Sequence, residues 1–167
     1  MYMAEKLIEL SDHPLSGFYL NETDLLLSTL HTLKTKGQKV ILLGVTFALL
    51  DLVERYPLNY PELIVAETGG MKGRRKEMVR EELHQILCQK MNLPVIHSEY
   101  GMTELLSQAY SRGKGIFRTP PWMKILVRDI YNPFSYVGEQ RTGGFNIIDL
   151  ANLHSCAFIA TQDIGMP

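Results

Sequence analysis

Apolar residues follow two alternating spacings between residues 21 and 111. Three short continuous apolar runs have the length of buried strands, at 40–43, 63–66 and 95–97. In the intervening segments apolar residues recur three and four positions apart, as on one face of a helix. This spacing predicts helices over 21–37, 46–56, 73–91 and 103–111. Alternating strands and helices predict an α/β fold, in which a mainly parallel sheet carries helices on both faces.

The pattern changes after Gly113. Glycine and proline residues separate short β-like runs, and helical spacing is largely lost; the runs lie at 123–127, 145–148 and 157–160. We therefore expect an α/β sheet part over 21–112 and a smaller β-rich part over 113–167. Residues 1–20 carry no strong pattern.

Composition narrows the class of protein. The 167 residues suffice for one domain with a real core, and 46% hydrophobic with 21% charged residues is ordinary for a soluble chain. The net charge of −1 gives no overall attraction to nucleic acid or to an anionic membrane, so we expect neither as a partner. Cys88 and Cys156 are too few for a disulfide framework or a metal cluster. With no signal peptide and no apolar run of about 18 residues, we expect a cytoplasmic protein.

Candidate chemistry follows two of the expected strands. In parallel α/β sheets, ligands bind at the carboxyl ends of strands. Gly69-Gly70 ends the second expected strand, and the segment 98–104, Ser-Glu-Tyr-Gly-Met-Thr-Glu, follows the third. Tyr100 offers an aromatic face for a base and Gly101 a close approach of the backbone. A hydroxyl and a carboxylate next to them can serve a phosphate and a metal ion, so the segment predicts a nucleotide site.

The segment 100–104 also resembles the Tyr-Gly-x-Thr-Glu motif of the adenylate-forming enzymes. Three blocks occur in the order typical of that superfamily: Gly69-Gly70, then 100–104, then Thr161-Gln162-Asp163. Residues 44–165 resemble one branch closely, the bacterial LuxE-type acyl-protein synthetases, which activate fatty acids for luminescence. Most relatives have Thr-Gly-Asp in the last block, and Gln162 fits the acyl-protein synthetase branch. The phrases that carry the likeness are Glu67-Thr68-Gly69-Gly70-Met71-Lys72-Gly73-Arg74, Ile96 to Glu104, Pro120-Pro121-Trp122-Met123 and Ala160-Thr161-Gln162-Asp163.

The resemblance implies an ATP-dependent ligase. A long-chain carboxylate would attack the α-phosphate of ATP, giving acyl-AMP and pyrophosphate, and the acyl group would pass to a thiol, with ATP and Mg²⁺ as cofactors and an acceptor protein such as a reductase as partner. Thr103 and Glu104 would be catalytic, and Glu104 would also anchor the metal. Tyr100 would stack on adenine and Asp163 would hold the ribose hydroxyls. The implied nucleotide-binding residues are Gly69, Gly70, Ser98, Glu99, Tyr100, Gly101, Met102 and Asp163.

Two parts of such an enzyme are not found in this sequence. Family members carry a Ser/Thr/Gly-rich phosphate loop ahead of the Gly-Gly block, and no such run occurs in residues 1–68. They also carry a small C-terminal domain with a catalytic lysine. We therefore expect the chain to be a partial adenylate-forming core, the middle of the large N-terminal domain, and to be inactive in isolation. Edges left exposed could promote homo-oligomers.

Each candidate residue also has an ordinary structural interpretation. Tyr100 could be a half-buried aromatic at a strand end, Thr103 a helix N-cap, and Asp163 an aspartate in a turn. The basic residues 72–76 could meet an anionic partner or form a solvated face. For the whole chain, the alternatives to an acyl-adenylating ligase are an inactive nucleotide-binding or interaction fragment of the same fold, and an unrelated doubly wound domain.

Overall fold

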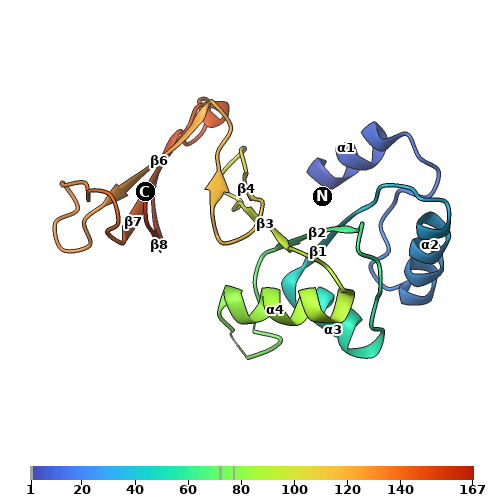
Figure 1. The fold of residues 1–167 in the computed structure, drawn as a ribbon. Coiled ribbons are helices and arrows are strands. Elements are labelled where there is room, and N and C mark those ends of the chain that lie inside the picture. Colours follow the sequence, from blue (N-terminus) through green and yellow to red (C-terminus); the bar gives the residue numbers. More distant parts are fainter. Residues whose placement is uncertain (1, 72, 77) are drawn as a thin grey trace.

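The computed structural model describes residues 2–71, 73–76 and 78–167. Figure 1 shows a helix-covered sheet formed by the first two thirds of the chain, with a second sheet at the C-terminal side. The larger sheet has the strand order β1-β2-β3-β4-β5, and the smaller has the order β6-β7-β8.

Three parallel strands form one side of the larger sheet, with β1 at its edge. They are β1 (Ile41–Val45), β2 (Ile64–Thr68) and β3 (His97–Tyr100), joined in parallel pairs. Val45 lies beside Thr68, and Glu67 lies beside Ser98, so the carboxyl ends of the strands meet at one edge. The apolar run at 63–66 fits the place of β2 between two parallel neighbours, where Val65 is fully buried. The short antiparallel strands β4 (Ala109–Ser111) and β5 (Phe117–Arg118) complete the sheet.

Three of the helices pack against one face of the larger sheet. On this face α3 (Thr46–Arg55) packs against α4 (Arg80–Met91), and α2 (Thr23–Thr35) joins the same apolar core. The side chains at the centre of this core are fully or almost fully buried: Leu50, Val53, Val65, Leu87, Met91 and Ile96.

The opposite face is met by α1 (Tyr2–Ser11). Tyr110 of β4 lies beside Glu99 and points to the face of the sheet opposite α4. Its hydroxyl donates to Met3 Sδ of α1 at 3.3 Å. No residue of α1 is fully buried, and the sequence predicts no helix within residues 1–20.

The smaller sheet is antiparallel. It consists of β6 (Met123–Arg128), β7 (Gly143–Asp149) and β8 (Phe158–Gly165), with the short helix η1 (Leu150–Asn152) after β7. These strands match the runs predicted from the sequence. The larger sheet continues through β5, past residue 112, so the second sheet begins at Met123.

The long helix predicted over 73–91 is shorter than expected. It begins at Arg80, and the described residues between Gly73 and Val79 form turns and irregular chain. Arg75 in this segment is tied to α3, because its guanidinium donates to the carboxylates of Asp51 and Glu54. This ion pairing favours the structural interpretation of the basic residues; Lys72 lies outside the described residues.

The helix predicted over 103–111 is wrong. Residues 103–104 form a turn, and the chain then enters β4. Ser107, Ala109 and Ser111 are buried while Tyr110 is exposed, which is the two-residue period of a strand. Thr103 therefore does not cap a helix.

None of the helices in the described ranges combines the length and the apolar character needed to cross a membrane.

Shortening Leu87 tests the core between α4 and the sheet. Leu87 is fully buried, so Leu87→Ala should lower the free energy of unfolding by about 2–5 kcal/mol, through lost burial and a residual cavity. Leu10→Ala is the control, because Leu10 is 80% exposed on α1 and its loss should change stability by less than about 0.5 kcal/mol. Urea unfolding measures both, and equal effects would contradict the assigned core.

Candidate functional site

A pocket of about 410 Å³ lies at the edge where the parallel strands end. It is built from the turn after β2, the end of β3, the first turn of α4 and Asp163 of β8. Segments more than one hundred residues apart in sequence thus share one cavity. Its lining residues are Thr46, Glu67, Gly69, Gly70, Met71, Met78, Arg80, Leu83, Glu99, Tyr100, Gly101, Met102 and Asp163.

A hydrogen bond joins the two sheets at this pocket. The Tyr100 hydroxyl donates to Asp163 Oδ2 at 2.6 Å. Burial, together with the bond to Asp163, raises the pKa of Tyr100, so the phenol stays neutral and remains a donor. The Tyr100 ring meets Phe117 and Phe145 edge-on, with centroids 6.3 and 6.1 Å away. The structure thus places Tyr100 and Asp163 within hydrogen-bond distance of each other.

The Gly69-Gly70 turn faces them from the end of β2. Both residues have positive φ, 78° and 66°, a conformation that favours glycine. Thr46 holds the turn in place, since its Oγ1 accepts from the Gly70 backbone N–H at 3.2 Å and donates to Glu67 Oε2 at 2.8 Å. A Cβ at Gly70 would meet no atom within 4 Å, so the backbone conformation and not crowding calls for glycine there.

Glu67 is a buried carboxylate with several partners. Its Oε1 lies 3.6 Å from His84 Nε2 and 3.9 Å from Arg80 Nε. Burial alone would raise the pKa of Glu67, but hydrogen bonds from His84, Ser98 and Thr46, with the charge of Arg80, outweigh it and lower the pKa. Glu67 is therefore ionised in the folded protein.

The Glu67, His84 and Ser98 side chains do not form a nucleophilic triad. Ser98 Oγ lies 3.2 Å from His84 Nε2, the same ring nitrogen that faces Glu67. In a catalytic triad the carboxylate bonds one nitrogen of the histidine ring and the nucleophile bonds the other nitrogen. Ser98 is 1% exposed and stands behind the pocket wall rather than in its lining.

Glu99 stands in contrast to Glu67. Its Oε2 is buried and has no hydrogen-bond partner among the described residues. Burial, and after it the nearby charge of Glu67, raise the pKa of Glu99. The pocket thus contains one well-paired carboxylate and one poorly paired carboxylate.

Thr103 and Glu104 lie in the exposed turn after β3 and are not among the described residues that line the pocket. The Glu104 carbonyl accepts from Asn152 Nδ2 at 2.6 Å, which anchors the turn to η1. Within the ranges that the structure describes, no three His, Cys, Asp or Glu side chains could together hold a metal ion. Mg²⁺ is commonly held by one or two carboxylates together with substrate phosphates. A single exposed carboxylate such as Glu104 fits that mode.

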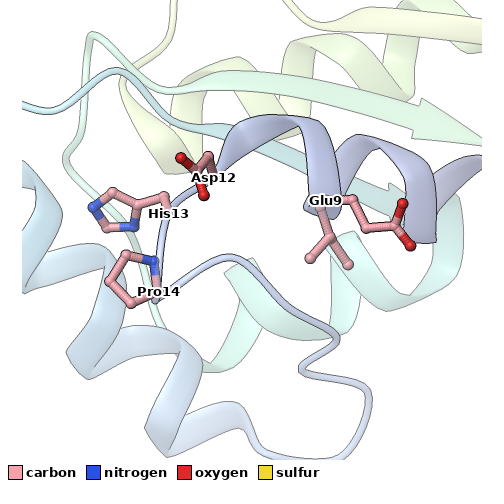
Figure 2. Close-up of a pocket in the computed structure, with 5 residues that line it drawn as sticks. Glu9, Asp12, His13 and Pro14 are labelled. Atoms are coloured by element: carbon pink, nitrogen blue, oxygen red, sulfur yellow. The ribbon is translucent and has the colours of Figure 1, made fainter.

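A separate hollow of about 380 Å³ lies at the end of α1 (Figure 2). All the side chains that line it come from one short stretch, residues 8–14, and the His13 ring is already engaged by the Leu15 backbone N–H at 3.2 Å. No strand-end residue contributes to this hollow, and we assign it no chemistry.

No protein-family model matches the chain, and no curated protein matches it. Its fold is similar to that of ATP-bound MatB from Rhodopseudomonas palustris, with a TM-score of 0.61, 14% identity, and coverage of 87% of this chain and 31% of that chain. It is also similar to 2-hydroxyisobutyryl-CoA ligase in complex with 2-HIB-AMP and CoA. Here the TM-score is 0.64 and the identity 13%, and the match covers 92% of this chain and 34% of that chain. A further likeness is to O-succinylbenzoate coenzyme A synthetase (MenE) from Bacillus subtilis. The TM-score is 0.55 and the identity 17%, and the match covers 84% of this chain and 33% of that chain.

The chain has the fold of a partial adenylate-forming core. It spans about one third of the length of these chains, 31% to 34%. At 13% to 17% identity, this likeness shows the fold alone. It does not distinguish the LuxE-type branch from the rest of the adenylate-forming superfamily.

Sequence reasoning missed several residues of this core's pocket. Thr46, Arg80 and Leu83 line it from α3 and α4. Thr46 had a usable signal, since it directly follows an expected strand, where ligand sites of parallel sheets lie. Arg80 and Leu83 had no such signal. The helix that carries them was expected to begin at residue 73, so its first turn was not placed at the pocket.

Removing the charge of Glu99 tests the electrostatics of the pocket. Because its folded-state pKa is raised, the stability contributed by protonated Glu99 is complete below the unfolded-state pKa and is lost as pH rises through the folded-state pKa. Glu99→Gln cannot ionise, so its free energy of unfolding relative to the parent should increase as pH rises from the unfolded-state pKa through the raised folded-state pKa of Glu99. The exposed Glu139→Gln is the control, and a difference that does not vary with pH would contradict the raised pKa of Glu99.

Proposed function

We propose that this chain supplies the adenine- and ribose-binding part of the active site of an ATP-dependent ligase that activates a carboxylate as acyl-AMP. The observation that carries the proposal is the Tyr100–Asp163 hydrogen bond opposite the Gly69-Gly70 turn, in one pocket at the strand ends. In this role Tyr100 stacks on adenine, and the turn after β2 lets the base approach the backbone.

Asp163 is suited to hold ribose hydroxyls. Its Oδ2 accepts from Tyr100, and its Oδ1 accepts no hydrogen bond from any described residue. The Asp163 backbone N–H donates to Thr161 Oγ1 at 3.2 Å, which supports the local conformation of β8. A charged acceptor that is fixed at one oxygen and free at the other can receive a hydroxyl without losing its orientation.

The residues after Tyr100 would serve the phosphate chemistry. A carboxylate is a weak nucleophile, so the reaction needs the two reactants positioned and the α-phosphate charge neutralised. Thr103 would donate its hydroxyl to the phosphate, and Glu104 would hold Mg²⁺, which neutralises phosphate charge when bound.

The resemblance to LuxE-type acyl-protein synthetases leads us to propose a long-chain fatty acid as the carboxylate, and a thiol on an acceptor protein, such as a reductase, as the group that receives the acyl chain. Both cysteines of the chain are free, in keeping with the proposed cytoplasmic location.

Binding of AMP tests the adenine and ribose roles. Tyr100→Ala and Asp163→Ala should each weaken AMP binding by about tenfold, since loss of stacking or of a charged acceptor costs about 1–3 kcal/mol. Tyr100→Phe keeps the aromatic face and should weaken AMP binding much less. Tyr131→Ala is the surface control, because Tyr131 is 96% exposed on another loop. Titration followed by amide NMR shifts measures all four, and unchanged affinity in Tyr100→Ala would sink the proposal.

Turnover by the 167-residue chain is expected to be undetectable. Its residues 1–68 contain no Ser/Thr/Gly-rich run to hold the triphosphate, and losing one preorganised charge-stabilising group typically costs about 10²–10³ in rate. This observation favours nucleotide binding without chemistry as the property of the isolated chain. The measurement is pyrophosphate release with ATP, Mg²⁺ and tetradecanoate. Robust release that disappears in Glu104→Ala would show that these residues suffice for catalysis.

A further inference from the structure

Asp149, outside the pocket, has the richest set of hydrogen bonds of any carboxylate in the described chain. It is the last residue of β7 and is fully buried. Its Oδ2 accepts from the backbone N–H groups of Leu106 and Ser107, at 3.0 and 2.9 Å. Its Oδ1 accepts from Ser107 Oγ at 2.7 Å and from the Ala151 N–H at 3.1 Å. A buried carboxylate is costly unless it is fully bonded, and these bonds join β7 to a segment more than forty residues away.

The bonds converge on the chain that follows the Thr103–Glu104 turn. Asn152, 4% exposed, donates to the Glu104 carbonyl and, at 2.9 Å, to the Cys156 carbonyl. Leu105 is 5% exposed and packs with Met123 and Ile147 of the smaller sheet. The backbone around the turn is therefore held by the smaller sheet, while the two side chains of the turn stay exposed.

The segment from Tyr100 to Ser107 is thus anchored at each end by an aspartate of the smaller sheet. Asp163 holds its first residue at the pocket, and Asp149 holds its last residues away from the pocket. β7 and β8 run antiparallel, and Asp149 and Asp163 lie towards opposite ends of that pair. The turn carrying Thr103 and Glu104 spans the distance between the two anchors.

We propose that Asp149 is a positioning residue for the Thr103–Glu104 turn, with Asn152 as its second support. This inference rests on the proposed function, because it concerns the metal-anchoring role of Glu104. Asp149 makes its bonds within the fold and does not reach the pocket lining. Asp149 fixes the backbone of residues 106 and 107 and Asn152 holds the Glu104 carbonyl, so together they limit the positions open to the Glu104 carboxylate and the Thr103 hydroxyl. Misplacement of such groups by about 1 Å can cost a factor of about 10² in a reaction.

The test compares Asp149→Ala, Asp149→Asn and a matched control. Asp129→Ala is the control: Asp129 directly follows β6 and also accepts two backbone N–H groups, from Tyr131 and Asn132. Amide hydrogen exchange reports whether the Leu106 and Ser107 N–H groups are released. Titrations with AMP, and with ATP in the presence and absence of Mg²⁺, separate the base and ribose contacts from the metal-dependent contact.

We expect Asp149→Ala to speed amide exchange at Leu106 and Ser107. We also expect it to abolish the gain in ATP affinity that Mg²⁺ gives the parent chain. That gain should be about tenfold, for one added carboxylate contact through the metal. AMP affinity should be unchanged. Asp149→Asn keeps one acceptor oxygen and should restore part of the gain, and it is the milder variant should Asp149→Ala not fold. Asp129→Ala should leave both measurements unchanged.

The inference would be overturned by unchanged exchange at the two amides, by equal losses of AMP and Mg²⁺-dependent ATP binding, or by a parent chain whose ATP affinity does not respond to Mg²⁺. In each of these cases AMP binding that depends on Tyr100 would leave the proposed function standing. Absence of AMP binding in the parent chain would instead refute the proposed function itself.

Discussion

The parallel register of β1, β2 and β3 is the constraint on which the rest of this structure depends. Val45 beside Thr68 and Glu67 beside Ser98 bring three strand ends to one edge. The turns that follow these strands must then share the space beyond that edge. A one-residue slip would turn every side chain of a strand to the other face, which would move Glu67 away from Thr46 and His84. The buried centre of β2 makes such a slip costly, because Val65 would leave the core.

Three carboxylates of this protein show how differently the fold treats the same chemical group. Glu67 is ionised and bonded to side chains, so it stiffens the wall between α3, α4 and the sheet. Asp149 is bonded chiefly to backbone and joins the two sheets. Glu99 is buried with one oxygen unpaired, and it is the group in the pocket whose environment a ligand can improve most. The pocket thus contains a fixed carboxylate, Glu67, and an unsatisfied one, Glu99, which is consistent with a site that binds a polar partner.

Much of this arrangement could be predicted from the sequence. The apolar runs at 40–43 and 63–66 predict β1 and β2, and topology then places the turns after the strands at one edge. The helix over 103–111 could not be excluded, because Leu105, Leu106 and Tyr110 also fit a helical spacing. Contact of Leu105 with the smaller sheet, a long-range effect, decides for an extended chain. The parts played by Thr46 and Asp149 depend on strand register and on the docking of two sheets, which hydrophobic spacing does not encode.

Trp122 gives the junction between the sheets a spectroscopic property of its own. It is the only tryptophan of the chain, about half exposed, and its Nε1 donates to Ser107 Oγ at 2.9 Å, next to the Asp149 carboxylate. All tryptophan fluorescence of this chain therefore comes from the junction between the two sheets. Indole emission is sensitive to its hydrogen bonds and to solvent. Emission wavelength and quenching therefore follow the separation of the two sheets, without any added label.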